Sequence, residues 1–268
     1  MANPCVHDRA RAALLESRAR MTYESPEPLG AFFIGSAPVG RLKSIVRDRL
    51  TSERYLSLIR TTPIGQRLLA DDDMQARNRA LAALLELLIE DGLLKSLTGE
   101  VVDVIYHGEL IAQVDRIAVR LLGLQTRVVR LVAVDAEGRE VLQKRSASKR
   151  IAPGLLDNFA AGMVAAGETP VTAMLRETRE ETGLVLTERT LGEPAFRFKS
   201  ARPVPDGFIF EENIVFKTEL PETFSPACED GEVECFMTMT NEEIMAAVEA
   251  KTLMPEAAHV FLTAHEND

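Results

Sequence analysis

The chain has 268 residues and a formal net charge of −10 at pH 7, with 46% hydrophobic and 27% charged residues. This composition is typical of a soluble globular protein with one large or two modest domains. The acidic balance argues against sequence-independent binding to nucleic acid or to an anionic membrane, because both need a basic face.

Cysteine usage and the N-terminal stretch bear on the compartment. Cys5, Cys228 and Cys235 are odd in number and form no CxxC pair, which favours free thiols in a reducing compartment over a zinc site. The N-terminal stretch is charged and lacks the apolar core of a secretory signal. No run of about 18 apolar residues occurs, so we expect no membrane span. These features predict a cytoplasmic protein.

The first 120 residues predict a small α+β domain. Residues 8–20 have a helical pattern, and AFFIG and PVGRL (31–35 and 38–42) are expected to pair as a short hairpin. The clearest helix covers residues 72–93, where acids open the segment and leucines repeat at helical spacing. A short strand, VVDVIYHG, and a helix-like segment, DRIAVRLLGL, follow at 101–108 and 115–124.

The pattern changes near residue 125. The Val-rich alternation of TRVVRLVAVDAEGREVLQKRS (126–146) predicts a β-hairpin. FIFEENIVFKTEL (208–220) and EVECFMTMT (232–240) predict strands, and NEEIMAAVEA (241–250) predicts a helix. Antiparallel strands with a few helices are typical of an α/β sandwich. We therefore predict an N-terminal domain over 1–120 and a second domain over 121–268.

A further helix is predicted over residues 170–182. Thr169 is a candidate N-cap, Pro170 suits the first turn, and Gly183 suits the position after the last turn. Five side chains recur at spacings of three and four and are expected to face the core: Val171, Met174, Leu175, Thr178 and Thr182.

The same helix carries a cluster of acids. Glu177, Glu180 and Glu181 can converge on one flank. Like charges at this spacing destabilise a helix by roughly 0.2–0.5 kcal/mol, and the macrodipole disfavours acids near the C-terminus. Arg176 offsets part of this cost as a neighbour of Glu180. The cluster is either a solvated surface or a ligand set for a hard cation such as Mg²⁺.

Residues upstream extend the pattern. The order G-x(5)-E-x(7)-R-E-x(2)-E-E-x-G-L starts at Gly162 and ends at Leu184. It resembles the Nudix box, G-x(5)-E-x(7)-R-E-U-x-E-E-x-G-U, in which U is an aliphatic residue. The one departure is Thr178 at an aliphatic position. The region from about 125 to 265 therefore resembles a Nudix domain.

This resemblance implies a Nudix-type α/β/α sandwich with a mixed sheet, in which the box forms a loop, a helix and a loop. It implies hydrolysis of a diphosphate linked to another group, with Mg²⁺ or Mn²⁺. The implied metal ligands are Glu177, Glu180 and Glu181, and Glu180, Glu181 or a glutamate outside the box would position or deprotonate water. The remaining box residues have other implied roles, Gly162 at the substrate and Glu168 with Arg176 as a structural pair.

Basic residues upstream of the box supply candidates for binding the diphosphate. Arg145 and Lys149 lie in LQKRSASKRIAPGLLDN, the densest basic cluster of the chain. They resemble diphosphate-binding residues of some Nudix branches, including isopentenyl-diphosphate isomerases. For Arg150 a solvated basic turn is an equally good explanation.

A glutamate downstream is a candidate for an additional ligand or base. Glu211 and Glu212 lie on a predicted strand with apolar neighbours, where several Nudix enzymes carry such a residue. Only one of the two can face the site, and we assign Glu211 to it. A charge on an edge strand is the alternative explanation, and Glu232 is a competitor for the role.

A more particular resemblance covers nearly the whole chain. Segments 111–126, 149–170 and 219–244 are similar to the Nudix branch that is related to thiamine pyrophosphokinase and carries a DUF4743-type N-terminal domain. The usual glycine pair reads Ala161-Gly162 here, and RVVRLVAVDAEG replaces an expected GVHxNG strand. Some members of that branch are thought to hydrolyse thiamine diphosphate or its analogues. An aromatic partner for such a ring would come from Phe residues such as Phe196, Phe198 or Phe208.

We therefore predict a Mg²⁺-dependent pyrophosphohydrolase, a monomer or homodimer, that acts on a small-molecule organic diphosphate. Thiamine diphosphate or an analogue is the candidate substrate. One alternative is an isopentenyl-diphosphate-isomerase-like enzyme, although no Cys lies near the box to transfer a proton. The other is a non-catalytic diphosphate-binding module, which the intact carboxylates disfavour. The N-terminal domain is expected either to complete the pocket or to dimerise.

Overall fold

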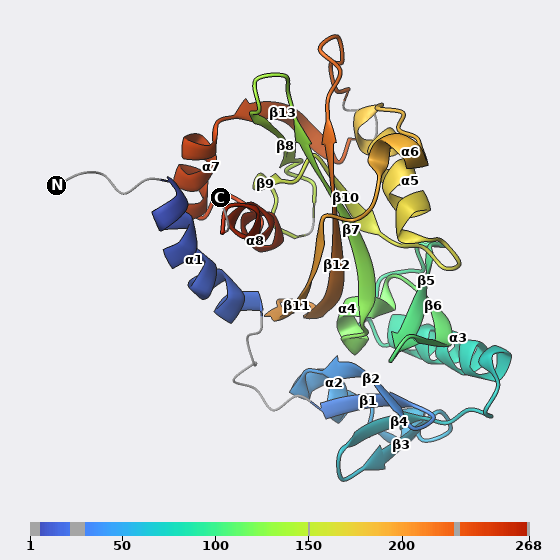
Figure 1. Cartoon of the computed structure of the whole chain (residues 1–268). Coiled ribbons are helices and arrows are strands. Elements are labelled where there is room, and N and C mark those ends of the chain that lie inside the picture. The colour runs from blue at the N-terminus through green and yellow to red at the C-terminus, as the bar shows by residue number, and fades with distance from the viewer. Residues whose placement is uncertain (1–5, 22–29, 150, 228–230, 267–268) are drawn as a thin grey trace.

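The computed structural model describes residues 6–21, 30–149, 151–227 and 231–266. Cys5, Cys228 and Arg150 lie outside these ranges, and Cys235 is a free cysteine, as expected. The described residues form a four-stranded sheet, a two-stranded hairpin and a seven-stranded sheet, with helices around them (Figure 1). Within these ranges, no helix is both long and apolar enough to cross a membrane.

The N-terminal part contains the four-stranded sheet. Its strands are β1 (Gly30–Ile34), β2 (Ala37–Leu42), β3 (Ile59–Thr62) and β4 (Gly65–Leu68), in the order β2-β1-β4-β3. β1 and β2 pair antiparallel, which confirms the predicted short hairpin, whereas β1 and β4 pair parallel. The helical segments are α2 (Ser44–Arg49), a 3₁₀ turn (Glu53–Tyr55) and α3 (Met74–Glu90).

Helix α3 confirms the helix predicted over 72–93 and organises the first core. Asp73 caps its N-terminus by accepting a hydrogen bond from the Ala76 backbone N–H at 2.9 Å. Its leucines Leu81, Leu84, Leu85 and Leu88 are buried, and burying each stabilises the fold by roughly 2 kcal/mol. The predicted strand and helix that follow are β5 (Val101–Tyr106) and α4 (Ala118–Leu122), and β6 (Glu109–Asp115) pairs with β5.

The C-terminal part is built on the seven-stranded sheet, in the order β11-β12-β7-β8-β13, with β10 paired to β7 and β9 to β8. Its strands are β7 (Thr126–Val134), β8 (Glu140–Arg145), β9 (Leu156–Asp157), β10 (Ala160–Met163), β11 (Phe196–Val204), β12 (Gly207–Glu219) and β13 (Val233–Met239). β12 runs parallel to β7 while the other pairs are antiparallel. The sheet is therefore mixed, as predicted.

Helices cover both faces of this sheet, which confirms the α/β/α sandwich (Figure 1). They are α1 (Val6–Met21), α5 (Pro170–Thr182), α6 (Glu188–Leu191), α7 (Asn241–Glu249) and α8 (Pro255–Ala264). α5 packs on β7 and β10. α1 packs on α7, α8 and β11, and Arg9 of α1 pairs with Glu242 and Glu249 of α7. The division at residue 120 stays a prediction, and α1 lies against the C-terminal part.

The bounds of α5 agree with those predicted from the sequence. Thr169 accepts a hydrogen bond from the Thr172 N–H at 3.1 Å, and Gly183 follows the helix at φ 74°. Of the five predicted inward side chains, Met174, Thr178 and Thr182 are buried, whereas Val171 and Leu175 are half-buried against the core. Thr178 tolerates the apolar position because its hydroxyl donates to the Met174 carbonyl at 2.6 Å.

Candidate active site

Two polar residues of the box, Glu168 and Arg176, form an ion pair. Arg176 donates through Nε and Nη2 to the two carboxylate oxygens of Glu168, at 2.9 Å each. Glu168 also accepts from the Ala165 backbone N–H at 3.0 Å, and Arg176 donates to the Met163 carbonyl at 3.2 Å. The hydrogen bonds from Arg176 hold the pKa of Glu168 below its ordinary value. This clamp fastens the loop before α5 to the helix.

Gly162 allows the first of the three clustered carboxylates to approach the sheet. A Cβ on Gly162 would lie 2.0 Å from Cδ of Glu177, so any other residue at this point of β10 would displace the carboxylate. The Glu177 side chain is 15% exposed and accepts a hydrogen bond from Arg176 Nη1 at 2.8 Å. Burial raises its pKa in spite of Arg176.

Glu181 is the most deeply buried of the three. It accepts hydrogen bonds from the Ala161 backbone N–H at 2.9 Å and from Nε2 of Gln143 at 3.2 Å. Both donors are neutral, and burial raises the pKa of Glu181 to about 8. Glu180 differs from it, because its side chain is 55% exposed and accepts from Arg176 Nη1 at 3.1 Å. The spacing on the helix alone does not distinguish these environments.

Six of the predicted site residues line one cavity of about 180 Å³. They come from separate strands, loops and α5: Arg145, Lys149, Gly162, Glu177, Glu181 and Glu211. Glu180 lines an adjoining cavity instead. Two larger hollows, of about 780 and 770 Å³, lie away from the box acids. The structure therefore brings the acidic and basic candidates together in the smaller cavity.

The cavity also contains basic and acidic residues that the sequence reasoning missed. Arg130 is 4% exposed, and its Nη1 donates to Asp157 Oδ1 at 3.0 Å. Arg145 donates to the other oxygen of Asp157, also at 3.0 Å. One carboxylate thus accepts hydrogen bonds from two guanidinium groups. The available signals were an arginine between the apolar residues Val129 and Leu131 of strand β7 and the LDN sequence that contains Asp157.

Of the two adjacent glutamates on β12, Glu211 lines the cavity. Among the described residues, none donates a hydrogen bond to its carboxylate, and burial and the nearby Glu256 raise its pKa. Glu212 lies outside the cavity lining, with its carboxylate 3.5 Å from Arg197. The competitor Glu232 lines the cavity as well and forms an ion pair with Lys149.

The candidate aromatic partners lie elsewhere. Phe208 is fully buried, whereas Phe196 and Phe198 pack against the cluster of Val132, Val215 and Val260. Within the described ranges, the cavity lining holds no aromatic side chain, and its apolar surface includes Ile209 and Met254. A stacked ring is therefore not provided by the residues expected to supply it.

The donors present suit a hard divalent cation by their chemistry. They are carboxylate oxygens, which Mg²⁺ and Mn²⁺ prefer, and burial raises the pKa of both Glu177 and Glu181. In the described part of the chain, however, no three His, Cys, Asp or Glu side chains are already grouped as a metal site. Arg176 holds both Glu177 and Glu180.

Comparison with known proteins identifies the family. The family model for the NUDIX domain matches residues 124–261, about half of the chain. The chain therefore belongs to the NUDIX domain family. The residues that carry the box, from Gly162 to Leu184, all lie inside the matched segment.

Individual relatives agree with this assignment. The chain is 26% identical over 181 residues to "Nudix hydrolase 20, chloroplastic" of Arabidopsis thaliana, covering 64% of this chain and 47% of the relative. It is 24% identical to "Nudix hydrolase 24, chloroplastic" of the same plant, covering 71% and 54%. The chain thus spans about half the length of these relatives. The crystal structure of DR0079 from Deinococcus radiodurans shares the fold, with a TM-score of 0.50 and 24% identity over 60% of this chain and 97% of that one.

Proposed function

We propose that this protein is a Mg²⁺- or Mn²⁺-dependent pyrophosphohydrolase that cleaves a diphosphate linked to an organic moiety. The observation that carries the proposal is the single cavity that joins Glu177, Glu181 and Glu211 to Arg145 and Lys149. A diphosphate with its metal ion presents charge of both signs, and the cavity offers partners for both.

Glu177, Glu180 and Glu181 would hold the cation. When bound, the cation neutralises phosphate charge and lowers the pKa of a bound water. Its positive charge would offset the effect of burial on Glu177 and Glu181, which raises the pKa of both carboxyl groups. Glu180, half-exposed on the helix, is free to turn from Arg176 toward the cation because an exposed ion pair contributes only about 0–1 kcal/mol.

We assign Glu211 the role of general base, with Glu180 and Glu181 as the other candidates. A base must accept a proton from the attacking water, and no described donor competes for the Glu211 carboxylate. Glu181 is already held by the Ala161 N–H and Gln143, so it suits a fixed ligand better than a proton acceptor.

The basic residues would orient the diphosphate. Arg145 is fixed by Asp157 and by the Ile151 carbonyl, to which its Nη2 donates at 3.1 Å. Lys149 is paired with Glu232 and would exchange this partner for a phosphate oxygen. A preorganised guanidinium beside a mobile ammonium gives one directional and one adaptable contact to phosphate.

The finer substrate assignment rests on the resemblance to the branch related to thiamine pyrophosphokinase. Thiamine diphosphate or an analogue stays a candidate, but the described cavity lining offers no ring to stack on it. The isomerase-like alternative shares Arg145 and Lys149, yet Cys235 does not line the cavity. The non-catalytic alternative does not explain why the cavity contains buried acids. We further propose that the protein acts in the cytoplasm as a monomer or homodimer.

The test is whether the protein with Mg²⁺ hydrolyses thiamine diphosphate, isopentenyl diphosphate or ADP. Hydrolysis is measured as phosphate release, and the organic product is identified. Glu180→Gln and Glu211→Gln are expected to lower kcat by about 10²- to 10⁴-fold. Glu212→Gln is the matched control and should retain parental activity. A parent that binds these compounds but releases no phosphate, or active Glu180→Gln protein, would overturn the proposal. An isomerised product would favour the alternative.

A further inference from the structure

The hairpin of β5 and β6 lies outside the segment 124–261 that the family model matches, but hydrogen bonds connect it to the box. The Ala166 backbone N–H donates to the Val101 carbonyl at 2.8 Å. The Gly167 N–H donates to Asp103 Oδ2 at 3.2 Å. These bonds join the hairpin to the loop that precedes α5, so they fix its position relative to the acids of the site.

Asp115 fixes the backbone next to Arg116. Its carboxylate accepts hydrogen bonds from the backbone N–H groups of Thr98, Gly99 and Ile117, at 2.9, 2.8 and 2.9 Å. Burial would raise the pKa of Asp115, but these hydrogen bonds outweigh it and the pKa is lowered. The Arg116 side chain therefore extends from a corner of the hairpin whose backbone is held in place by these hydrogen bonds.

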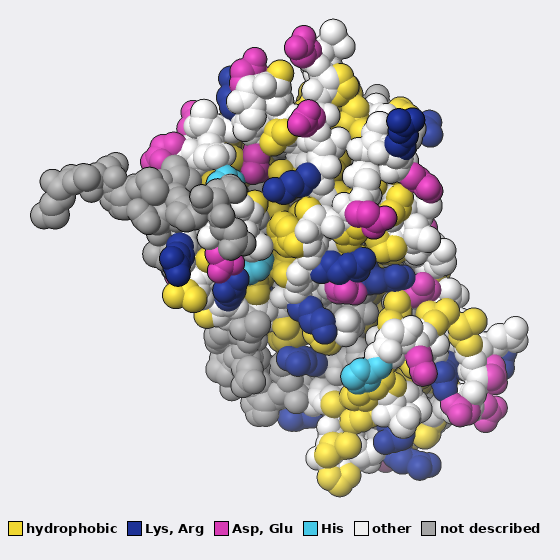
Figure 2. Space-filling view, in the orientation of Figure 1, with side chains coloured by type: hydrophobic (Ala, Val, Ile, Leu, Met, Phe, Trp, Pro, Cys, Tyr) yellow, Lys and Arg dark blue, Asp and Glu magenta, His cyan; other side chains and the backbone are white. Residues whose placement is uncertain are grey.

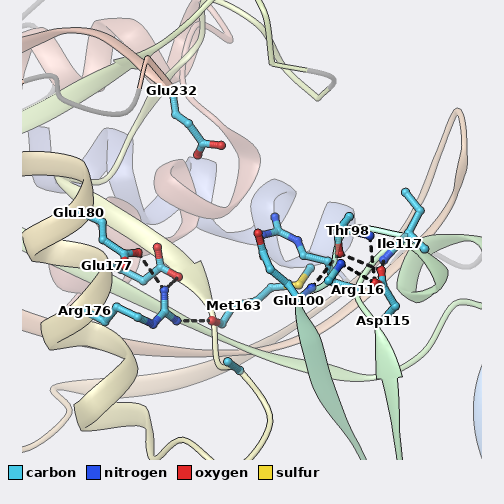
Figure 3. A network of polar contacts seen from close by, with 12 residues as sticks. Thr98, Glu100, Asp115, Arg116, Ile117, Met163, Arg176, Glu177, Glu180 and Glu232 are labelled. Atoms are coloured by element: carbon cyan, nitrogen blue, oxygen red, sulfur yellow. Dashed lines mark hydrogen bonds and ion pairs between the residues drawn. The ribbon is translucent and has the colours of Figure 1, made fainter. Parts of the chain in front are cut away.

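A cavity of about 710 Å³ lies between this corner and α5. In Figure 3, Glu177 and Glu180 lie on one side of an open space, Glu100 and Arg116 lie on the other, and Glu232 lies above it. The cavity adjoins the smaller one, because Arg116, Glu177 and Glu232 line both. A ligand that reaches from one to the other would pass Arg116.

Arg116 is more available to a ligand than the other arginine of this cavity. Arg176 donates to Glu168, Glu177 and Glu180. The Arg116 side chain is 45% exposed, and its ion-pair partner, Glu100, is 61% exposed. An exposed pair of this kind contributes only about 0–1 kcal/mol, so a phosphate group displaces Glu100 at little cost.

We propose that the larger cavity binds the organic moiety of the substrate and that Arg116 contacts the phosphate attached to it. The inference rests on the function proposed above and extends it to the N-terminal part of the chain. The walls combine apolar surface from Val101 and Met163 with the polar groups of Glu100 and Glu180. This mixture and the volume suit a polar moiety of nucleoside size rather than an isoprenoid chain.

A steric block tests the location of the moiety. Val101 is 41% exposed and lines the cavity, whereas Leu110, on the other strand of the hairpin, is 43% exposed and does not. Val101→Trp should raise KM for ADP and thiamine diphosphate at least tenfold and leave KM for methyl diphosphate within twofold. Leu110→Trp should change none of these values. Equal effects of Val101→Trp on all three substrates, or no effect, would overturn the inference.

A charge test addresses Arg116. Arg116→Met should raise KM at least tenfold for every diphosphate that the parent hydrolyses, with kcat within threefold. Arg54→Met is the matched control, because Arg54 and its partner Glu90 are also 45% and 61% exposed. If the parent hydrolyses methyl diphosphate but neither larger substrate, only the inference fails. If the parent hydrolyses none of the three, the proposed function fails as well. Unchanged KM values in Arg116→Met would also contradict the inference.

Discussion

Glu168 and Glu181 belong to the same box but occupy opposite electrostatic environments. Glu168 receives two hydrogen bonds from Arg176, and its pKa is lowered. Glu181 receives only neutral donors, and burial raises its pKa to about 8. The first carboxylate stabilises the fold, whereas the second costs stability unless a cation arrives. This difference separates a structural acid from a proposed metal ligand.

The largest effects are expected at Glu181, where a substitution should lower activity and raise stability. Glu181→Gln should lower kcat by about 10²- to 10⁴-fold, because a ligand is lost. The pKa of Glu181 is raised on folding, so its charge lowers stability as pH rises from about 4.5 to about 8. The variant should therefore gain on the order of 1–3 kcal/mol at pH 8 without metal. Hydrolysis assays and urea unfolding measure both, and a loss of stability would contradict the account.

The same change at Glu168 should act in the other direction on stability. Glu168→Gln leaves Arg176 without its main partner and should lower the free energy of unfolding by about 1–3 kcal/mol at pH 7. The pKa of Glu168 is lowered on folding, so the contribution is present above its ordinary pKa and disappears as pH falls below it. Urea unfolding at pH 7 and pH 3 gives the comparison. A variant as stable as the parent at pH 7 would refute the structural role.

Gly162→Ala tests how closely Glu177 must approach the sheet. The added Cβ would lie 2.0 Å from Cδ of Glu177, so the carboxylate has to move. We expect kcat/KM to fall about 10- to 100-fold, with a loss of about 1–3 kcal/mol in unfolding free energy. Kinetics with Mg²⁺ and urea unfolding measure the two effects. Unchanged kinetics would mean that the position of Glu177 is not critical.

The smallest effect is expected at Glu140, a buried acid that lines neither cavity of the box acids. It is 6% exposed, and burial raises its pKa to about 7, opposed in part by Lys217. The folded state therefore binds the extra proton between about pH 4.5 and 7, and stability falls as pH rises through that window. Glu140→Gln should gain roughly 1–2 kcal/mol at pH 8 and nothing at pH 4. The variant should hydrolyse the substrate at the parental rate. Reduced activity would show that Glu140 also affects hydrolysis, which would contradict the distinction drawn here between Glu140 and Glu181.

Local patterns in the sequence predicted the helix of the box and the central hairpin, but not strand β10, which carries Gly162. The cap at Thr169, the glycine at 183 and the alternation of β7 were sufficient for α5 and the central hairpin. β11 was missed because the charged residues and proline of FRFKSARPV interrupt the apolar alternation, and α8 was also not predicted.

The parts of the site that the sequence did not predict depend on contacts between distant segments. Arg130 and Asp157 are 27 residues apart and meet only when β7 and β9 fold into one sheet. Arg116 reaches the site because the hairpin is bonded to the box loop. Helical spacing placed Glu180 and Glu181 on one flank but did not distinguish the exposed acid from the buried one.

The most direct test of the account is Mn²⁺ binding measured by electron paramagnetic resonance in the presence of methylenediphosphonate. The parent should bind Mn²⁺ at micromolar to millimolar concentrations, the Glu177→Gln/Glu181→Gln protein should bind at least tenfold more weakly, and Glu140→Gln should match the parent. Equal affinity in the parent and in the double variant would contradict the claim that the buried acids of α5 hold the catalytic cation.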